Sequence, residues 1–290
     1  MRVPFRLVDV FTDRPLAGNQ LCVVAEPLDL PSELMQAVAR EIGFSETTFV
    51  TEVGDARYAM RIFTPGAELS FAGHPSLGTA FVMVSEGRTA SPVVQSTAAG
   101  EVPIEVEVTP GGTSGRARMR QLPPSFGPEL HDAAAVADAV GLSPGDLHPE
   151  LPPQVVSTGG AQLLVPVADA GAVVRAASDR RGLAALVEGL GTHTAYVFAA
   201  KGDRARARLF AVGLGIDEDP ATGSAAGPLG AYLWTRGLLP GGRLEISQGA
   251  EIGRPSTLSV EVEPGEGAPR VFVGGGVVRV GEGVFELPSP

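Results

Sequence analysis

Two glycine-led segments carry side chains that could bind an anion and handle protons. They read Gly73-His74-Pro75 and Asp219-Pro-Ala-Thr-Gly223-Ser224, and each precedes small and apolar residues typical of a buried helix. A helix start presents N–H groups without intrahelical acceptors and the positive end of the dipole, which suit a carboxylate or an oxyanion. We expect both glycines and Ser224, a natural helix cap, to bind substrate, and His74 and Asp219 to be catalytic. Taken singly, His74 could equally be a capping histidine and Asp219 an Asp-Pro turn.

A glutamate, Glu46, completes the set of candidate proton-handling groups. It follows Gly43, which is expected to end a helix, and it opens a strand that continues Thr-Thr-Phe-Val. A carboxylate that points into a cleft is desolvated, and desolvation raises its pKa toward that of a useful general acid or base. The alternative from spacing alone is a solvated loop glutamate.

The elements that would position these residues occur twice. Residues 61–81 and 208–232 each begin with Arg-x-Phe, continue through an acidic loop, and reach a glycine followed by a small-residue helix. This repeat predicts two pseudo-symmetric halves whose two helix starts face one cleft. The alternative is a chance match between two segments of a glycine-rich chain.

The remaining pattern predicts an α/β (α+β) fold. Many short strands accompany two amphipathic helices, 31–42 and 130–140, a further helix at 179–190, and two apolar helices, 75–86 and 225–236. The simplest packing wraps a mixed, barrel-like sheet around each apolar helix. Pro- and Gly-rich residues 109–128 are the best candidate boundary. We predict one half at 1–118, joined by C-terminal strands near 276–290, and the other at 119–275.

Composition excludes several classes of function. The formal net charge of −11 disfavours nucleic acid as a partner, and no stretch approaches the ~20 apolar residues of a membrane span. Nothing marks the chain for export, so we expect a cytoplasmic location. Dinucleotide and P-loop motifs are missing, and the single lysine, Lys201, lies in an expected turn, so no cofactor is expected. Scattered histidines and a lone cysteine, Cys22, make a metal site unexpected.

Taken together, these segments resemble the PhzF-like family, named for the phenazine-biosynthesis isomerase, which shares the diaminopimelate epimerase fold. The resemblance spans nearly the whole chain. It is carried by the blocks Val8-Asp-Val-Phe-Thr12 with Gly18-Asn19, Gly43-Phe-Ser-Glu46-Thr-Thr-Phe-Val50, Phe71-Ala-Gly-His-Pro75, Glu218-Asp-Pro-Ala-Thr-Gly-Ser-Ala225 and Ser247-Gln-Gly249.

The resemblance implies a homodimer without a cofactor and an active site between the two halves. It assigns Glu46 as the proton-shuttling glutamate, and it places Asn19 among the substrate-binding residues. One departure is Gln20, which stands where the family often has proline; this position bears on substrate specificity more than on the chemistry. The related epimerases use two cysteines, and the single Cys22 excludes that two-thiol mechanism.

These observations predict an isomerase that shifts a proton on a small carboxylate-bearing metabolite, with Glu46 as the general acid and base. Two alternatives stay open. One is a one-base racemase or epimerase on the same scaffold, and the other is a non-catalytic module that binds a small molecule or a protein.

Overall fold

The computed structural model describes residues 1–288, and the chain forms two compact units. Among the described residues, unit 1 comprises residues 1–120 together with 274–288, and unit 2 comprises residues 121–273. The sequence-based boundaries at 118/119 and 275/276 lie within two residues of these divisions. Within residues 1–288, none of the helices is long and apolar enough to cross a membrane.

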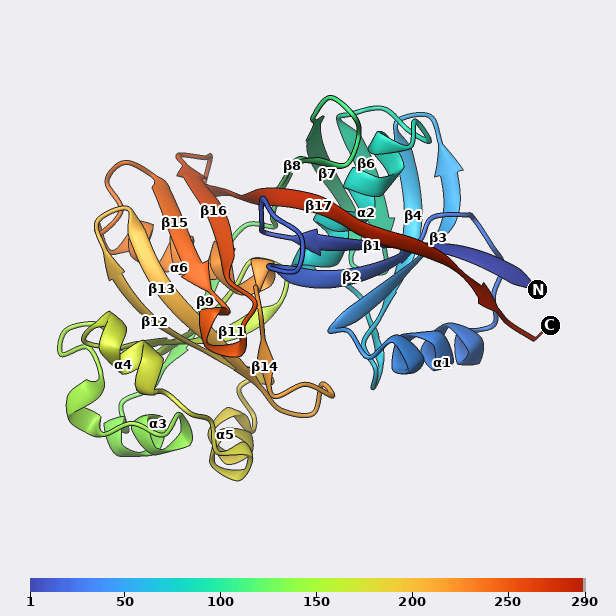
Figure 1. Cartoon of the computed structure of the whole chain (residues 1–290). Helices are drawn as coiled ribbons and strands as arrows, with labels where there is room; N and C mark the ends of the chain where they lie inside the picture. Colours follow the sequence, from blue (N-terminus) through green and yellow to red (C-terminus); the bar gives the residue numbers. More distant parts are fainter. Residues whose placement is uncertain (289–290) are drawn as a thin grey trace. The chain divides into compact units, whose positions relative to one another are not determined.

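Unit 1 is a closed barrel of eight strands, shown in blue to green with red β17 in Figure 1. Each strand pairs with the next and β17 pairs with β1, so the sheet has no free edge. Parallel pairs β2–β3 and β4–β6 interrupt an otherwise antiparallel order. In barrel order the strands are β1 (Arg2–Val10), β2 (Asn19–Val24), β3 (Glu46–Gly54), β4 (Arg57–Phe63), β6 (Val93–Thr97), β7 (Gly100–Val108), β8 (Ser114–Arg120) and β17 (Arg270–Glu286).

The apolar helix of unit 1, α2 (Gly73–Ser85), runs inside this barrel and contacts β1, β2, β3, β6, β7 and β8. Its first eleven residues are all buried, as expected for a helix that is apolar on every side. The amphipathic helix α1 (Ser32–Ile42) packs outside on β3 and β4, and Gly43 ends it in the left-handed conformation. The predicted arrangement of one inner and one outer helix is confirmed for this unit.

Unit 2 repeats the strand order with more helices outside. Its pairs β11–β12 and β13–β15 are parallel, as are β2–β3 and β4–β6 in unit 1. The apolar helix α6 (Gly223–Thr235) contacts β10, β11, β15 and β16. The strands are β9 (Ser125–Glu129), β10 (Gln154–Ser157), β11 (Ala161–Pro166), β12 (Thr194–Lys201), β13 (Arg204–Ala211), β15 (Arg243–Gln248) and β16 (Ser256–Glu263).

Three short helices cover the outer face of unit 2, where the sequence predicted two, at 130–140 and 179–190. They are α3 (Ala133–Ala139), α4 (Ala170–Arg175) and α5 (Arg180–Val187), each begun by an aspartate whose side chain accepts an N–H of the first turn. Their apolar residues share one core with β10–β13, including Val140, Leu183 and Val197.

The Arg-x-Phe repeat has the same structural role in both units. Arg61 on β4 makes a bidentate ion pair with Glu68 on β5 (Glu68–Leu69), at 2.7 and 2.6 Å. Arg208 on β13 makes the same pair with Glu218 on β14 (Glu218–Asp219), at 2.8 and 2.7 Å. In each unit the guanidinium also lies over the ring of the phenylalanine two residues later. The repeated contacts fix the acidic loop that leads to the helix start.

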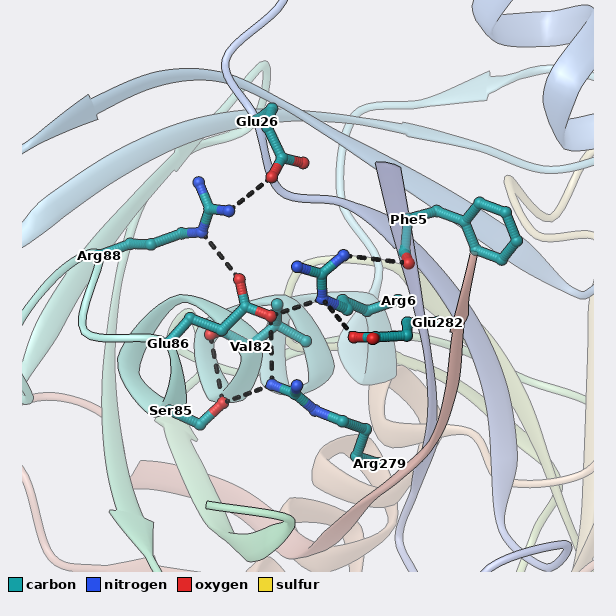
Figure 2. Close-up of polar contacts among 9 residues, drawn as sticks. All are labelled: Phe5, Arg6, Glu26, Val82, Ser85, Glu86, Arg88, Arg279 and Glu282. Carbon is teal, nitrogen blue, oxygen red and sulfur yellow. Dashed lines mark hydrogen bonds and ion pairs between the residues drawn. The ribbon is translucent and has the colours of Figure 1, made fainter. Parts of the chain in front are cut away.

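At the C-terminal end of α2, one glutamate forms hydrogen bonds with three arginines (Figure 2). Glu86, the C-cap residue, accepts hydrogen bonds from Arg6 at 2.6 Å, Arg88 at 2.9 Å and Arg279 at 3.2 Å, and Arg88 also reaches Glu26. Burial raises the pKa of Glu86, but the hydrogen bonds from Arg88 and Arg6 lower it more, so the net shift is downward. The arginines thus offset a negative charge placed at the negative end of the helix dipole.

Candidate functional site

Both predicted helix starts exist, and both begin earlier than the sequence indicated. Helix α2 begins at Gly73 and α6 begins at Gly223, two residues before the predicted starts at 75 and 225. Pro75 is therefore the third helical residue, where its missing N–H costs nothing because the first N–H groups of a helix have no intrahelical acceptor. The N–H groups of Gly73 and Gly223, the first of each helix, have no intrahelical acceptor and can bind an anion.

In unit 1, the structure brings Glu46 and His74 together. Glu46 opens β3 and is half-buried, His74 lies in the first turn of α2 and is 3% exposed, and His74 Nε2 lies 3.4 Å from Glu46 Oε2. A second contact joins the same strand and helix, because the Thr48 and Thr79 hydroxyls lie 2.8 Å apart. The solvated-loop alternative for Glu46 therefore does not hold.

His74 is held neutral by its surroundings. Burial lowers its pKa to about 3, and a hydrogen bond with the Gln20 backbone opposes that shift only in part. Nε2 makes no hydrogen bond to any residue within 1–288 and faces Glu46, so Nδ1 is the nitrogen that donates to the Gln20 carbonyl. The lone pair of Nε2 then points at the carboxyl group of Glu46.

Asn19 is connected to the Glu46–His74 site through its neighbour in the chain, Gln20. It is the first residue of β2, is 1% exposed and pairs with Val10, and it directly precedes the Gln20 backbone that His74 contacts. Gln20, where the family often has proline, thus contributes through its backbone.

In unit 2, Asp219, Gly223 and Ser224 lie on one turn. Asp219 ends β14 and is 6% exposed, and Thr222, the N-cap residue of α6, donates its hydroxyl to Asp219 Oδ2 at 2.5 Å. The expectation that Ser224 caps the helix is wrong, because Ser224 is its second residue and its hydroxyl lies 3.5 Å from Gln162 Nε2.

Two buried glutamines form hydrogen bonds with the same turn, and the sequence had not indicated a role for either of them. Gln121 donates to the Gly223 carbonyl at 2.9 Å and reaches it because residue 227 is glycine; a Cβ there would lie 1.7 Å from Gln121 Oε1. Gln248 hydrogen-bonds both Asp219 and Thr222. The block Ser247-Gln-Gly249 marked Gln248 in the sequence, but nothing in its spacing indicated a role.

The described residues offer little for a metal ion. Within residues 1–288, no group of three or more His, Cys, Asp or Glu side chains could hold one. Cys22 is buried, and burial raises the pKa of its thiol to about 12, so it stays an unreactive thiol near neutral pH. The groups with usable chemistry are the Glu46–His74 pair and the Asp219 turn.

Comparisons with known proteins point to one family. The family model described as "Phenazine biosynthesis-like protein" matches residues 8–283. A trans-2,3-dihydro-3-hydroxyanthranilate isomerase from Pseudomonas fluorescens is 36% identical over 286 residues, which cover 97% of this chain and 98% of that protein.

Solved structures agree. A phenazine biosynthesis protein of the PhzF family from Bacillus anthracis matches with a TM-score of 0.87 at 28% identity, covering 99% of this chain and 100% of that one. A predicted epimerase from Pseudomonas aeruginosa matches with 0.86 at 35% identity and the same coverage. A probable proline racemase from Agrobacterium radiobacter, 14% identical with a TM-score of 0.67 and coverage of 99% and 93%, shares the fold.

Proposed function

This chain belongs to the phenazine biosynthesis-like family and is an isomerase, and we propose that it moves a proton on a small carboxylate-bearing substrate without a cofactor. Glu46 is the general acid and base in this proposal. The observation that carries it is the pairing of a half-buried carboxyl with a buried neutral imidazole at a helix start. A carboxyl that takes a proton from carbon can use such a partner to hold the proton until it is returned.

His74 assists Glu46 as a hydrogen-bond acceptor. Because its Nδ1–H is committed to Gln20, its Nε2 lone pair can accept a proton or a hydrogen bond only from the Glu46 side. When Glu46 takes a proton from the substrate, the new O–H is stabilised by donating to Nε2. The proton is then held at the site and returned, at the same or another carbon, rather than lost to water.

The helix starts bind the negative charge of the substrate in this proposal. The first N–H groups of Gly73 and Gly223, the Ser224 hydroxyl and the buried Asn19 are the candidate donors to a carboxylate or a developing enolate. Each well-placed donor of this kind can lower the barrier by about 3–4 kcal/mol. Asp219 would hold a hydrogen-bond donor group of the substrate.

The first substrate to test is trans-2,3-dihydro-3-hydroxyanthranilate, the compound named for the 36% identical relative from Pseudomonas fluorescens. Purified protein is incubated with it in deuterated water, and the position of the label is read by NMR. Glu46→Gln keeps the size of the side chain and removes its acid–base chemistry. We expect it to lower kcat at least about a hundredfold, and a wild-type rate in that variant would rule Glu46 out.

A one-base epimerase is the second candidate, favoured by the likeness to the 35% identical predicted epimerase from Pseudomonas aeruginosa. Deuterium at an inverted stereocentre without a shifted double bond would support it. The relatives' names as isomerases favour an enzyme over the binding-module alternative. A homodimer is part of the proposal, and multi-angle light scattering of the purified chain tests it.

A further inference from the structure

Gln248, the last residue of β15, lies beneath the turn that carries Asp219. It is 2% exposed and its amide makes four hydrogen bonds. Nε2 donates to the Asp219 carbonyl at 2.8 Å and to Thr222 Oγ1 at 3.0 Å, while Oε1 accepts from the Tyr196 hydroxyl at 3.0 Å and from the Thr222 N–H at 3.2 Å. Two donors and two acceptors exhaust what a glutamine amide can do.

These bonds fix the orientation of the amide. The backbone N–H of Thr222 can only donate, so the atom facing it must be the oxygen of Gln248. The nitrogen therefore faces the Thr222 hydroxyl, which must accept from it. The single hydrogen of that hydroxyl is then committed to Asp219 Oδ2, 2.5 Å away.

The direction of this chain of bonds determines how Asp219 meets a ligand. Gln248 donates to Thr222, and Thr222 donates to Asp219, so Asp219 receives a hydrogen bond at Oδ2 and is stabilised as a carboxylate. A carboxylate can accept hydrogen bonds and cannot donate one. The partner it suits is an N–H or O–H group, or a positive charge.

The backbone next to Gln248 packs closely against the turn that carries Asp219. Gly249 has φ of +79°, and a Cβ there would lie 2.4 Å from the Pro220 carbonyl oxygen. Both the left-handed conformation and the close approach require glycine at this position. The Ser256 hydroxyl lies 3.2 Å from the same Pro220 carbonyl and 2.9 Å from the Arg254 carbonyl. The strand end and the turn therefore form one packed unit.

Unit 1 has a similar glutamine that lacks this connection. Gln95 on β6 accepts from the Tyr58 hydroxyl at 2.9 Å and donates to Ser76 Oγ at 2.9 Å, and Ser76 donates to the Ala72 carbonyl at the start of α2. Gln95 thus supports a helix from beneath, as Gln248 does, but the serine it reaches donates to a backbone carbonyl and not to a carboxylate. The difference between the two glutamines is the bond through Thr222 to Asp219.

We infer that Gln248 is a positioning residue that acts through the Thr222 hydroxyl to present Asp219 as an ionised acceptor for an N–H or O–H group of the substrate. This inference rests on the proposed function for its substrate, and its central measurement does not require turnover. It assigns the Asp219 carboxyl a binding role and not the role of a proton donor.

The test follows the Asp219 carboxyl directly. Protein labelled with ¹³C at its aspartate carboxyls is titrated by NMR, and the Asp219 signal is assigned with Asp219→Asn. In Thr222→Val, which is close in size and lacks the hydroxyl, the midpoint of the Asp219 titration should move to higher pH by about one unit, and Thr222→Ser should restore it. Equal midpoints in wild type and Thr222→Val would overturn the inference.

A matched pair of variants separates positioning from general loss of stability. Gln248→Met should move the Asp219 signal in the same direction as Thr222→Val. Gln95→Met removes the equivalent buried amide of unit 1 and should leave the Asp219 midpoint unchanged. Equal shifts in the two variants would mean that the effect is not transmitted through Thr222, which also overturns the inference.

Kinetics provide a second measurement once a substrate turns over. Thr222→Val should raise KM about tenfold or more while kcat changes less than about threefold, because Asp219 binds the substrate equally in the ground and transition states. A loss confined to kcat would contradict the binding role. If wild type fails to turn over the tested compound, that substrate is wrong, and the NMR result alone decides on Gln248.

Discussion

The neutral state of His74 predicts how the protein responds to acid. Its imidazole has a pKa of about 3 in the folded chain because it is buried, compared with about 6.5 when exposed. Between these values the unfolded chain binds a proton at His74 that the folded chain does not. Stability from this residue is therefore complete above pH 6.5 and is lost as pH falls from about 6.5 toward 3.

The size of the loss follows from the two pKa values. At pH 5 the protein is about 1.5 pH units below the pKa of the unfolded imidazole and still above that of the folded one, which corresponds to about 2 kcal/mol of unfolding free energy. His74→Gln removes this contribution. The fall in stability between pH 7.5 and pH 5 should be about 2 kcal/mol smaller in the variant than in wild type.

The measurement has to report on unit 1. The only tryptophan, Trp234, lies in α6 of unit 2, so its fluorescence follows the other unit. Hydrogen exchange of the α2 amides at the two pH values gives the opening free energy of unit 1. His193→Gln, which replaces an exposed histidine, is the matched control and should show the wild-type pH dependence.

A protonated His74 in the folded chain would give the opposite dependence of stability on pH. If Glu46 held His74 as an imidazolium, the pKa of His74 would be raised, and wild type would gain stability relative to His74→Gln as pH falls. Such a gain, or equal pH dependence in the two proteins, would refute the argument that burial dominates. Nitrogen-15 shifts of the ring provide a direct check, with a protonated Nδ1 and an unprotonated Nε2 expected at about pH 6.

Three further changes test the packing of unit 1, each measured by urea unfolding with circular dichroism. Glu86→Gln should lower the unfolding free energy by about 2–3 kcal/mol, because it leaves three partly buried arginines without their shared carboxylate. The control is Glu101→Gln, which removes a carboxylate that is 61% exposed and should change the unfolding free energy by less than about 0.5 kcal/mol. Gly78→Ala should cost about 1–3 kcal/mol despite alanine's better helix propensity, because the new Cβ would lie 2.6 Å from a Leu21 methyl; a stabilised variant would contradict the close packing. Thr47→Val should keep or raise stability, since its buried hydroxyl has no hydrogen-bond partner within residues 1–288, and a loss above about 1 kcal/mol would show that a partner exists.

Local patterns were sufficient to predict the elements of this fold. The two apolar helices, the strand before each and the Arg-x-Phe repeat depend on residues close together in the chain, and all are present. The short helix α4, of mostly small residues, was missed, although Asp169 at its start is a recognisable N-cap signal. The pairing of Glu46 with His74 could be expected only through the family resemblance, because spacing alone favoured a solvated glutamate.

The residues that form hydrogen bonds with the Asp219 turn could not be predicted from sequence patterns. Gln248 comes beside Thr222 because β13 and β15 pair in parallel, and nothing in the 26 residues of sequence separation sets that register. Ser224 had the right type for a cap, but the helix begins at Gly223, two residues before the predicted start at 225, so Thr222 is the N-cap residue. A long-range pairing thus determined the role of a glutamine, and a shift of two positions changed the role of a serine.

The small residues of α2 and α6 have a cause that links fold to site. A helix enclosed by its own sheet is approached by strand side chains from several directions, so several of its positions cannot carry a Cβ without a clash. At Gly78 and Gly230 the obstacles are apolar strand residues, and at Gly227 the obstacle is the Gln121 amide that holds the Gly223 carbonyl. In α6, Gly230 therefore lets the helix fit its sheet, and Gly227 lets a buried polar side chain reach the first turn. The small residues of α6 thus serve a polar contact at the helix start as well as a tight core.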